Sequence, residues 1–529
     1  MKRKSNHRLE AACVVSLVVL SLVTSASFGQ RFPVSEDALR SLIYADRFWD
    51  TASNGTIEMQ KPYIGVNLFL LPVIAVAGPT RDAFKWGQTF FTVMAVLAAY
   101  AAARALFSRR TAFLSGVILA FMPTFVMMRW DEQPFLAFGL MAALALFLDF
   151  RKNGRSASLC AASVLSGACA YVKLTSLYFF AAVLFSYAVL IVSGKVKKPL
   201  LSVRAVGLAA VFFLLGASPL LWHNAKSGWD TASLVEGGSV GASWRFLDVL
   251  LVRPGQLLMA VEGYEGSYPF SHLFQPLLWL GAGVFLLATA VAVAGRKPAD
   301  LFLVVSLACF TFLLAFLPPP SPPRALHLYH MLPFAAMLMA GFFAKLSEHR
   351  KAAGLALLVA MLSLNLANIA TASARLSDQS WIEENFARMS SVHYGFSVFL
   401  QNGDTLLMPG IRMIEMNANY IEINGIILQR EAVCQGSNLN GRSVAECNMT
   451  KMKEVIEANE AGRLVFVCVP LERKSYAIYE EDCMGPESVC YRPLLAVREA
   501  AEELGKRLQK IGSVNDSKGD EAYSVYLIV

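Results

Sequence analysis

The sequence predicts an α-helical polytopic membrane protein with about eleven transmembrane helices, followed by a small C-terminal α/β domain on the extracytoplasmic side. Of its 529 residues, 56% are hydrophobic and 16% are charged, whereas about a quarter of the residues of a soluble domain are charged. The apolar residues lie in blocks of roughly 17–23, the length that crosses a bilayer. Lysine and arginine gather in alternate short loops, so the net charge of +8 does not indicate nucleic-acid binding.

The first apolar block, residues 9–29, follows a basic N-terminal stretch. Thr24-Ser25-Ala26 is similar to the small-residue cleavage site of a signal peptide, so a cleaved signal and a retained helix both fit. We expect a retained helix with a cytoplasmic N-terminus. Either alternative places residue 30 on the outer side.

The next apolar stretch, residues 63–78, is only about sixteen residues long, which is short for a span. It also contains Asn67 and Pro72. We expect it to lie along the outer surface as an interfacial helix within an outer loop that covers residues 30–82. The further predicted spans are 83–103, 111–128, 134–150, 156–172, 174–194, 205–222, 273–295, 301–318, 328–344 and 352–370.

The distribution of basic residues supports this topology. The short outer loops carry only Arg129, Lys173 and Arg324, and the predicted inner loops carry all of the following: Arg104, Arg109, Arg110, Arg151, Lys152, Arg155, Lys195, Lys197, Lys198, Arg204, Arg296, Lys297, Lys345, Arg350 and Lys351. This is the positive-inside bias of membrane proteins, and it would reverse if 63–78 crossed the bilayer. Residues 1–372 therefore form the membrane domain, and residues 373–529 lie outside.

The outer segments are long: 30–82, 223–272 and the C-terminal domain. A channel has little need of them, whereas an enzyme that works at the outer face does. The first segment contains Glu36 and Asp37. They lie at the start of a predicted helix whose apolar positions have helical spacing: Leu39, Ile43 and Phe48. Both acids fit a catalytic role and also fit simple complementation of the helix dipole.

A second acidic cluster, Arg129-Trp130-Asp131-Glu132, lies in the tight loop between two spans. It is either a local ion pair or a functional group of carboxylates. Because Glu36 and Asp37 face the same side, the two clusters together suit deprotonation of an acceptor or binding of a divalent cation.

Several cations lie at the same membrane edge. Lys61 precedes the interfacial stretch and either reaches water or holds a lipid phosphate as a point charge. Lys173 ends a span, and Arg324 follows a stiff proline run and suits forked contacts to phosphate oxygens. His327 follows Arg324, but no paired carboxylates lie nearby in the sequence, so we expect no metal there.

The order of these motifs resembles the GT-C superfamily of membrane glycosyltransferases, especially the protein mannosyltransferase and aminoarabinose transferase branch. The likeness covers roughly residues 9–345 and rests on the following motifs in order: Glu36-Asp37, Lys61-Pro62, Arg129 with Asp131, Ala170-Tyr171-Val172-Lys173-Leu174-Thr175, and Arg324 with His327 and His330-Met331-Leu332-Pro333-Phe334. The order of the motifs and their shared sidedness carry the resemblance.

The resemblance implies a polyprenyl-phosphate-linked sugar donor and inversion at the sugar carbon. It implies that Asp37 or Glu36 is the catalytic base and that Asp131 is a second acidic site. Lys61 and Arg324 would bind the donor phosphate, and Arg129, Glu132, Lys173 and His327 complete the expected substrate contacts. Gln60 replaces an acid of the aminoarabinose branch, so the sequence does not assign a metal. No cofactor is expected with certainty, although a divalent cation stays open.

The sequence thus predicts a glycosyltransferase in the membrane, most simply the bacterial inner membrane, that acts on an unknown acceptor: protein, lipid or glycan. It contains no glycine-rich nucleotide loop. The alternatives are a transporter or flippase of lipid-linked saccharides, a non-catalytic membrane scaffold, and a polysaccharide polymerase or ligase. A transporter would want charged residues at mid-depth in the spans, which are nearly free of them.

The C-terminal region reads as a small α/β domain with strands at 405–408, 420–428, 463–469 and 522–529 and helices at 449–459 and 495–511. Its cysteines are Cys434, Cys447, Cys468, Cys483 and Cys490. An extracytoplasmic location allows disulfides. We expect Cys483 to pair with Cys490.

Overall fold

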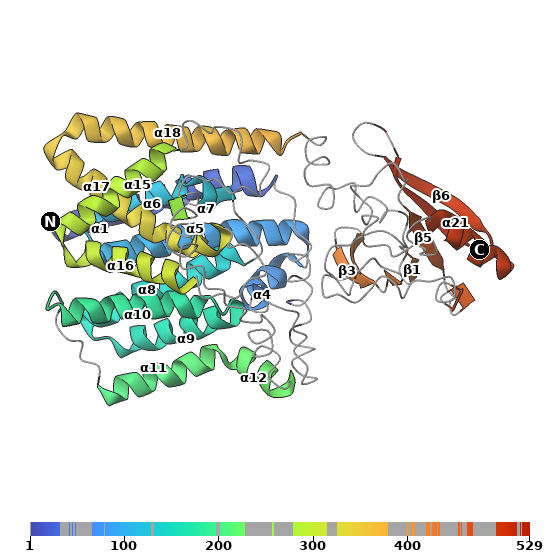
Figure 1. The fold of residues 1–529 in the computed structure, drawn as a ribbon, viewed down its shortest axis with the longest axis horizontal. Coiled ribbons are helices and arrows are strands. Elements are labelled where there is room, and N and C mark those ends of the chain that lie inside the picture. Colours follow the sequence, from blue (N-terminus) through green and yellow to red (C-terminus); the bar gives the residue numbers. More distant parts are fainter. Residues whose placement is uncertain are drawn as a thin grey trace, which may run out of the picture. The chain divides into compact units, whose positions relative to one another are not determined.

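The computed structural model divides into two compact units (Figure 1). The first unit comprises residues 1–31, 47–73 and 85–373, and the second comprises residues 32–46, 74–84 and 374–529. The predicted boundary after residue 372 stays a prediction. The structure describes residues 2–31, 42, 45, 48, 66–78, 80–127, 132–196, 202–227, 257–258, 279–314, 325–378, 399, 401, 405–407, 419–423, 426–430, 432–433, 453–454, 456–457, 463–468, 493–515, 519 and 521–529.

The described part of the membrane region is helical. Its elements are α1 (Lys2–Gly29), α4 (Val66–Ala77), α5 (Arg81–Leu106), α6 (Arg109–Ala120), α7 (Pro123–Met127), α8 (Gln133–Asn153), α9 (Ser156–Val172), α10 (Ser176–Val192), α11 (Val203–Gly216), α12 (Ser218–Ser227), α15 (Trp279–Gly295), α16 (Pro298–Leu314), the 3₁₀ helix η2 (Ala325–Met331), α17 (Leu332–His349) and α18 (Lys351–Arg375).

Several of these helices are membrane spans by length and composition. Among the described residues, 5 stretches qualify: Arg8–Gly29, Asp82–Leu106, Gln133–Asn153, Leu328–His349 and Lys351–Arg375. The pair α11 and α12, which bends by 61° at its break, brings the number to 6. The protein is therefore a polytopic membrane protein, and the count of about eleven spans stays a prediction.

The short helix α4 covers most of the stretch predicted to be interfacial. It contains 12 residues, with Pro72 inside it. At a rise of 1.5 Å per residue the helix is about 18 Å long, well short of the roughly 30 Å of a bilayer core. Its length fits the interfacial prediction.

Helix α1 is packed into the helical unit. Leu17 and Phe28 are fully buried. Near the start of the helix, the Glu10 carboxylate accepts a hydrogen bond from the Tyr100 hydroxyl and lies 2.9 Å from the Arg109 Nε. These contacts hold both ends of α1 and favour the retained helix over a cleaved signal peptide.

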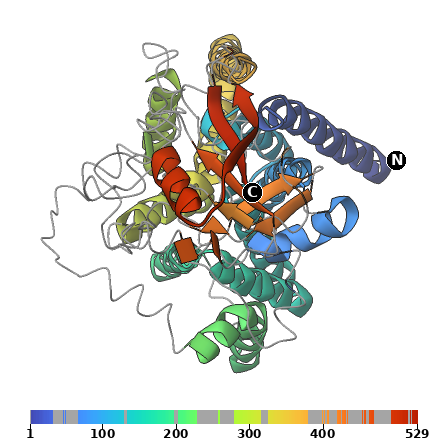
Figure 2. The same ribbon diagram turned by 90° about the vertical axis from the view of Figure 1, so that its right-hand side faces the viewer.

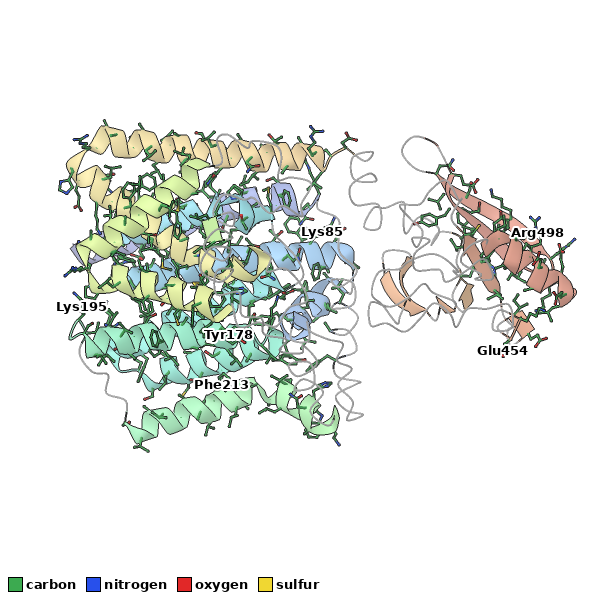
Figure 3. The ribbon with its side chains drawn as sticks, in the orientation of Figure 1. Lys85, Tyr178, Lys195, Phe213, Glu454 and Arg498 are labelled. Atoms are coloured by element: carbon green, nitrogen blue, oxygen red, sulfur yellow. The ribbon has the colours of Figure 1, made fainter. Side chains whose placement is uncertain are left out.

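One end of the helical unit collects residues of the predicted inner loops. The Lys195 Nζ donates to the Arg296 carbonyl, which joins the α10 and α15 ends. The Lys345 Nζ lies 2.7 Å from the Asp300 Oδ2, which joins α17 to the start of α16. Figure 3 shows Lys195 at this end and Lys85 at the opposite end.

The opposite end collects residues of the predicted outer loops. The Lys85 Nζ donates to the Gln30 carbonyl at 2.9 Å, and the Arg31 guanidinium donates to Ser373 near the end of α18. These contacts bring residue 31, at the start of the first predicted outer segment, beside residue 373, at the start of the last one. The alternation of the remaining loops and the side of the membrane on which each end lies stay predictions.

The second unit contains a five-stranded sheet of order β4-β1-β5-β7-β6. Its strands are β1 (Thr405–Leu407), β4 (Ala432–Val433), β5 (Leu464–Cys468), β6 (Leu508–Asn515) and β7 (Glu521–Ile528). Strand β1 runs parallel to β4 and β5, and β7 runs antiparallel to β5 and β6. Helix α21 (Pro493–Glu503) lies against the sheet (Figure 2). Val497 of this helix and Phe466 of β5 belong to one buried cluster.

Two sequence predictions in this unit need correction. The predicted single strand 420–428 is an antiparallel pair, β2 (Asn419–Ile423) and β3 (Ile426–Arg430). Asn424-Gly425 separates the two strands in the sequence, a dipeptide typical of two-residue hairpin turns. The predicted helix 495–511 is too long, because α21 ends at Glu503 and β6 begins at Leu508. Gly505 has a φ of 70°, the left-handed conformation that commonly ends a helix.

The described cysteines are free thiols: Cys13, Cys160, Cys169, Cys309 and Cys468. Burial raises the pKa of the Cys468 thiol to about 12, so this cysteine is an apolar part of β5 and a poor nucleophile. The expected Cys483–Cys490 disulfide lies outside the described residues, as do Cys434 and Cys447.

Candidate functional site

The predicted site residues fall into two groups. Most lie outside the residues that the structure describes: Glu36, Asp37, Lys61, Arg129, Asp131 and Arg324. Their roles and mutual positions stay predictions. Glu132 and Lys173 are fully described, and the backbone of His327 is described within η2.

Glu132 and Lys173 form a buried ion pair. Glu132 lies at the N-terminal boundary of α8, and Lys173 lies at the C-terminal boundary of α9 in an extended conformation. The Lys173 Nζ lies 2.5 Å from the Glu132 Oε1, and the two residues are only 9% and 1% exposed. The structure thus brings together two residues that are 41 positions apart in the sequence.

Gln133 extends this pair and was not predicted to take part in the site. Its side chain is fully buried, and its Nε2 donates to the Glu132 Oε1 at 2.7 Å. The same carboxylate oxygen therefore accepts from both Lys173 and Gln133. The sequence feature that could have pointed to Gln133 is its place between Glu132 and Pro134, because a proline in the first turn marks the start of a helix, beside a candidate site residue.

The 3₁₀ helix η2 packs against α8 and α17. The Tyr329 hydroxyl donates to the Phe125 carbonyl of α7 at 2.8 Å, and the rings of these two residues stack at 5.0 Å. His330 is fully buried, with its ring edge-on to Phe310. His330 is therefore a core residue, and η2 places the backbone of His327 beside the helix that Glu132 begins.

The described part of this region carries little net charge. The ammonium and the carboxylate of the buried pair neutralise each other, so the pair does not present a free cation or a free base. Among the described residues, no group of three or more histidine, cysteine, aspartate or glutamate side chains could hold a metal ion. The ion pair joins the C-terminal end of α9 to the N-terminal end of α8.

Comparison with known proteins places this geometry in context. Residues 60–223 match the family described as dolichyl-phosphate-mannose-protein mannosyltransferase. ArnT from Cupriavidus metallidurans in the apo state has a TM-score of 0.62 at 12% identity, over 98% of both chains. The same protein bound to undecaprenyl phosphate has a TM-score of 0.60 at 13% identity, over 97% of both chains. No curated protein sequence matches the chain.

The resemblance to the GT-C membrane glycosyltransferases, stated above from sequence motifs, is confirmed by the family match and the structural match to ArnT. The chain has an ArnT-like fold. It is a mostly helical, polytopic membrane protein with several apolar spans and a small C-terminal β-sheet.

Proposed function

We propose that the protein transfers a sugar from a polyprenyl-phosphate-linked donor to an acceptor at the outer face of the membrane. The observation that carries this proposal is the correspondence of fold along 97% of both chains with ArnT bound to undecaprenyl phosphate. The match of residues 60–223 to a family named for a dolichyl-phosphate-linked sugar supports the same class of donor.

In the proposed reaction, an acceptor hydroxyl oxygen attacks the anomeric carbon of the sugar. The bond from that carbon to the phosphate oxygen breaks, and polyprenyl phosphate leaves. Attack opposite the leaving group inverts the configuration at the sugar carbon. The hydroxyl proton passes to Asp37 or Glu36, and Asp131 assists the acceptor or a divalent cation.

The leaving phosphate needs cationic stabilisation. We assign this role to Lys61 as a point charge beside the interfacial helix and to Arg324 as a forked donor to the phosphate oxygens. His327 follows Arg324 in the sequence, and its backbone belongs to the described helix η2. It is a candidate contact to the same substrate. Arg129, which precedes Asp131 by two residues, is another.

A transporter or flippase of lipid-linked saccharides is the main rival. Such proteins place ionisable groups at mid-depth in their spans. In the described helices of the membrane region, the acids that make ion pairs lie toward helix ends: Glu10 near the start of α1, Glu132 at the N-terminal boundary of α8, Asp149 near the end of α8 and Asp300 in the first turn of α16. This distribution favours the transferase over the transporter.

Simultaneous replacement of Glu36 by glutamine and Asp37 by asparagine is expected to reduce sugar transfer by about 100-fold or more, because the acceptor loses its base. The measurement is release of polyprenyl phosphate from purified protein given a polyprenyl-phosphate-linked sugar and candidate acceptors. Asp82→Asn, in the exposed first turn of α5, is the matched control and is expected to keep full activity.

Thermal stability of the double variant is expected to equal that of the unchanged protein. Full transfer by the stable double variant would refute the assigned base. Transport of the lipid-linked sugar across vesicles without any transfer would favour the rival.

A further inference from the structure

We propose that the lysine- and arginine-rich end of the helical unit binds the phosphate of an anionic phospholipid, where the ends of α10, α15 and α17 meet. This basic cluster comprises Lys195, Arg296, Lys297, Lys345 and Asp300, so its formal charge is +3. Figure 3 shows Lys195 at this end. The proposed sugar transfer uses none of these residues, and the inference does not depend on it.

Packing brings together cations that are far apart in the sequence. The Lys195 Nζ lies 3.3 Å from the Arg296 carbonyl oxygen, although 101 positions separate the two residues. The Lys345 Nζ lies 3.5 Å from the point that a Cβ on Gly295 would occupy. Among the described residues, the pair of Lys345 with Asp300 is the ion pair of this cluster. Topology requires basic loops but not their close approach, whereas a shared anion compensates cations that are held together.

Arg296 has a backbone conformation that usually belongs to glycine. Its φ is 49°, and it is the one described residue other than glycine with a positive φ. Its N–H donates to the Ala292 carbonyl at 3.2 Å, so it follows directly on the end of α15. Glycine adopts this conformation at lower cost, and an arginine there therefore indicates a use for its side chain. The residue is exposed, and a guanidinium forks onto phosphate oxygens.

Exposed apolar residues lead directly to the cluster and indicate that the phosphate belongs to a lipid. Val192 at the end of α10 is 88% exposed and stands three residues before Lys195. Val293 of α15 is 49% exposed and stands three residues before Arg296. Lipid tails along these helix faces would place their headgroup at the cations. Basic pockets between the ends of membrane helices are a known type of site for anionic headgroups.

The test measures lipid binding to the delipidated full-length protein in detergent, by native mass spectrometry during titration with phosphatidylglycerol or phosphatidylcholine. The variant is Arg296→Asn with Lys297→Gln, in which asparagine tolerates the left-handed conformation. We expect the variant to bind phosphatidylglycerol about tenfold more weakly or worse, since each cation near a headgroup contributes roughly fivefold. Its affinity for the zwitterionic phosphatidylcholine is expected to stay within about twofold, because that headgroup has no net charge to lose.

The matched control, Lys152→Gln with Arg155→Gln, removes two exposed cations from the segment between α8 and α9. It is expected to bind phosphatidylglycerol like the unchanged protein. Arg296→Lys with Lys297→Arg keeps both charges and is expected to retain most of the affinity, and the thermal midpoint checks that each variant folds. A loss below about fivefold in the folded Arg296 and Lys297 variant, or an equal loss in the control, would overturn the proposal.

A soluble phosphate tests whether the occupant is a lipid. Glycerol 3-phosphate carries the same charged group without tails. At about a hundredfold excess it is expected to leave phosphatidylglycerol bound, because burial of the tails along α10 and α15 adds to the affinity. Displacement of the lipid by this excess would contradict a phospholipid site and would assign the cluster to soluble phosphates.

Discussion

Gly167→Ala is expected to destabilise the helical unit by about 3 kcal/mol or more, since it forces two helix backbones apart. A Cβ on Gly167 of α9 would lie 2.1 Å from the Phe213 carbonyl oxygen and 2.7 Å from the Ala217 nitrogen of the facing α11 segment. A Cβ on Gly216 would likewise lie 2.0 Å from the Val164 carbonyl oxygen. Because the opposing atoms belong to the backbone, no change of side-chain rotamer relieves the clash.

This contact is the kind that membrane helices use, since small residues let two backbones approach where burial in lipid gives no driving force. Helix α11 lies at the edge of the unit in both views and packs along α9 (Figures 1 and 2). Gly207→Ala on the same helix is the matched control, because a Cβ there has no atom within 4 Å. The measurement is the thermal midpoint of the purified protein in detergent. Equal midpoints for Gly167→Ala and Gly207→Ala would contradict the close packing.

Lys345→Met is expected to destabilise the protein by about 3–5 kcal/mol, the usual effect of leaving a buried charge without its partner. The Asp300 side chain is only 5% exposed, and its Oδ2 lies 2.7 Å from the Lys345 Nζ. Neutralising both residues, in Asp300→Asn with Lys345→Met, is expected to restore much of the loss. The thermal midpoint in detergent again reports the effect.

An exposed pair provides the control for this second prediction. The Lys510 Nζ lies 2.8 Å from the Glu521 Oε1, with side chains 45% and 34% exposed. Because solvent screens such pairs, Lys510→Met is expected to cost less than about 1 kcal/mol. A loss for Lys345→Met as small as that for Lys510→Met would contradict the account of Asp300 as a buried, paired charge.

Much of the helical unit is predictable from the sequence because lipid imposes simple rules. Block length and the alternation of basic loops predict which loops share an end. The contacts of Lys195 with Arg296 and of Arg31 with Ser373 agree with that grouping. Propensity is weaker evidence in the second unit. There the reversal between β2 and β3 coincides with Asn424-Gly425, a hairpin signal that the reading of 420–428 as one strand overlooks, and Gly505 ends a helix that periodicity extends too far.

The ion pair in the candidate site was beyond sequence reasoning. Glu132 and Lys173 were each predicted as substrate contacts, but 41 positions separate them and no periodicity links them. Only the packing of α8 beside α9 brings the two together. Conversely, spacing identifies Glu36 and Asp37 as candidates but does not distinguish two adjacent acids at the start of a helix.

The central claim is that the acidic and cationic site residues share the outer face, opposite the lysine- and arginine-rich end. Single cysteines at Asp37, Asp131 and Lys195, placed in protein without native cysteines, test it through a membrane-impermeant maleimide added to sealed vesicles with the outer face exposed. The account predicts labelling at positions 37 and 131 and none at position 195 until the vesicles are opened. Labelling of only one of positions 37 and 131 in the sealed vesicles, or of position 195 alone, would contradict it.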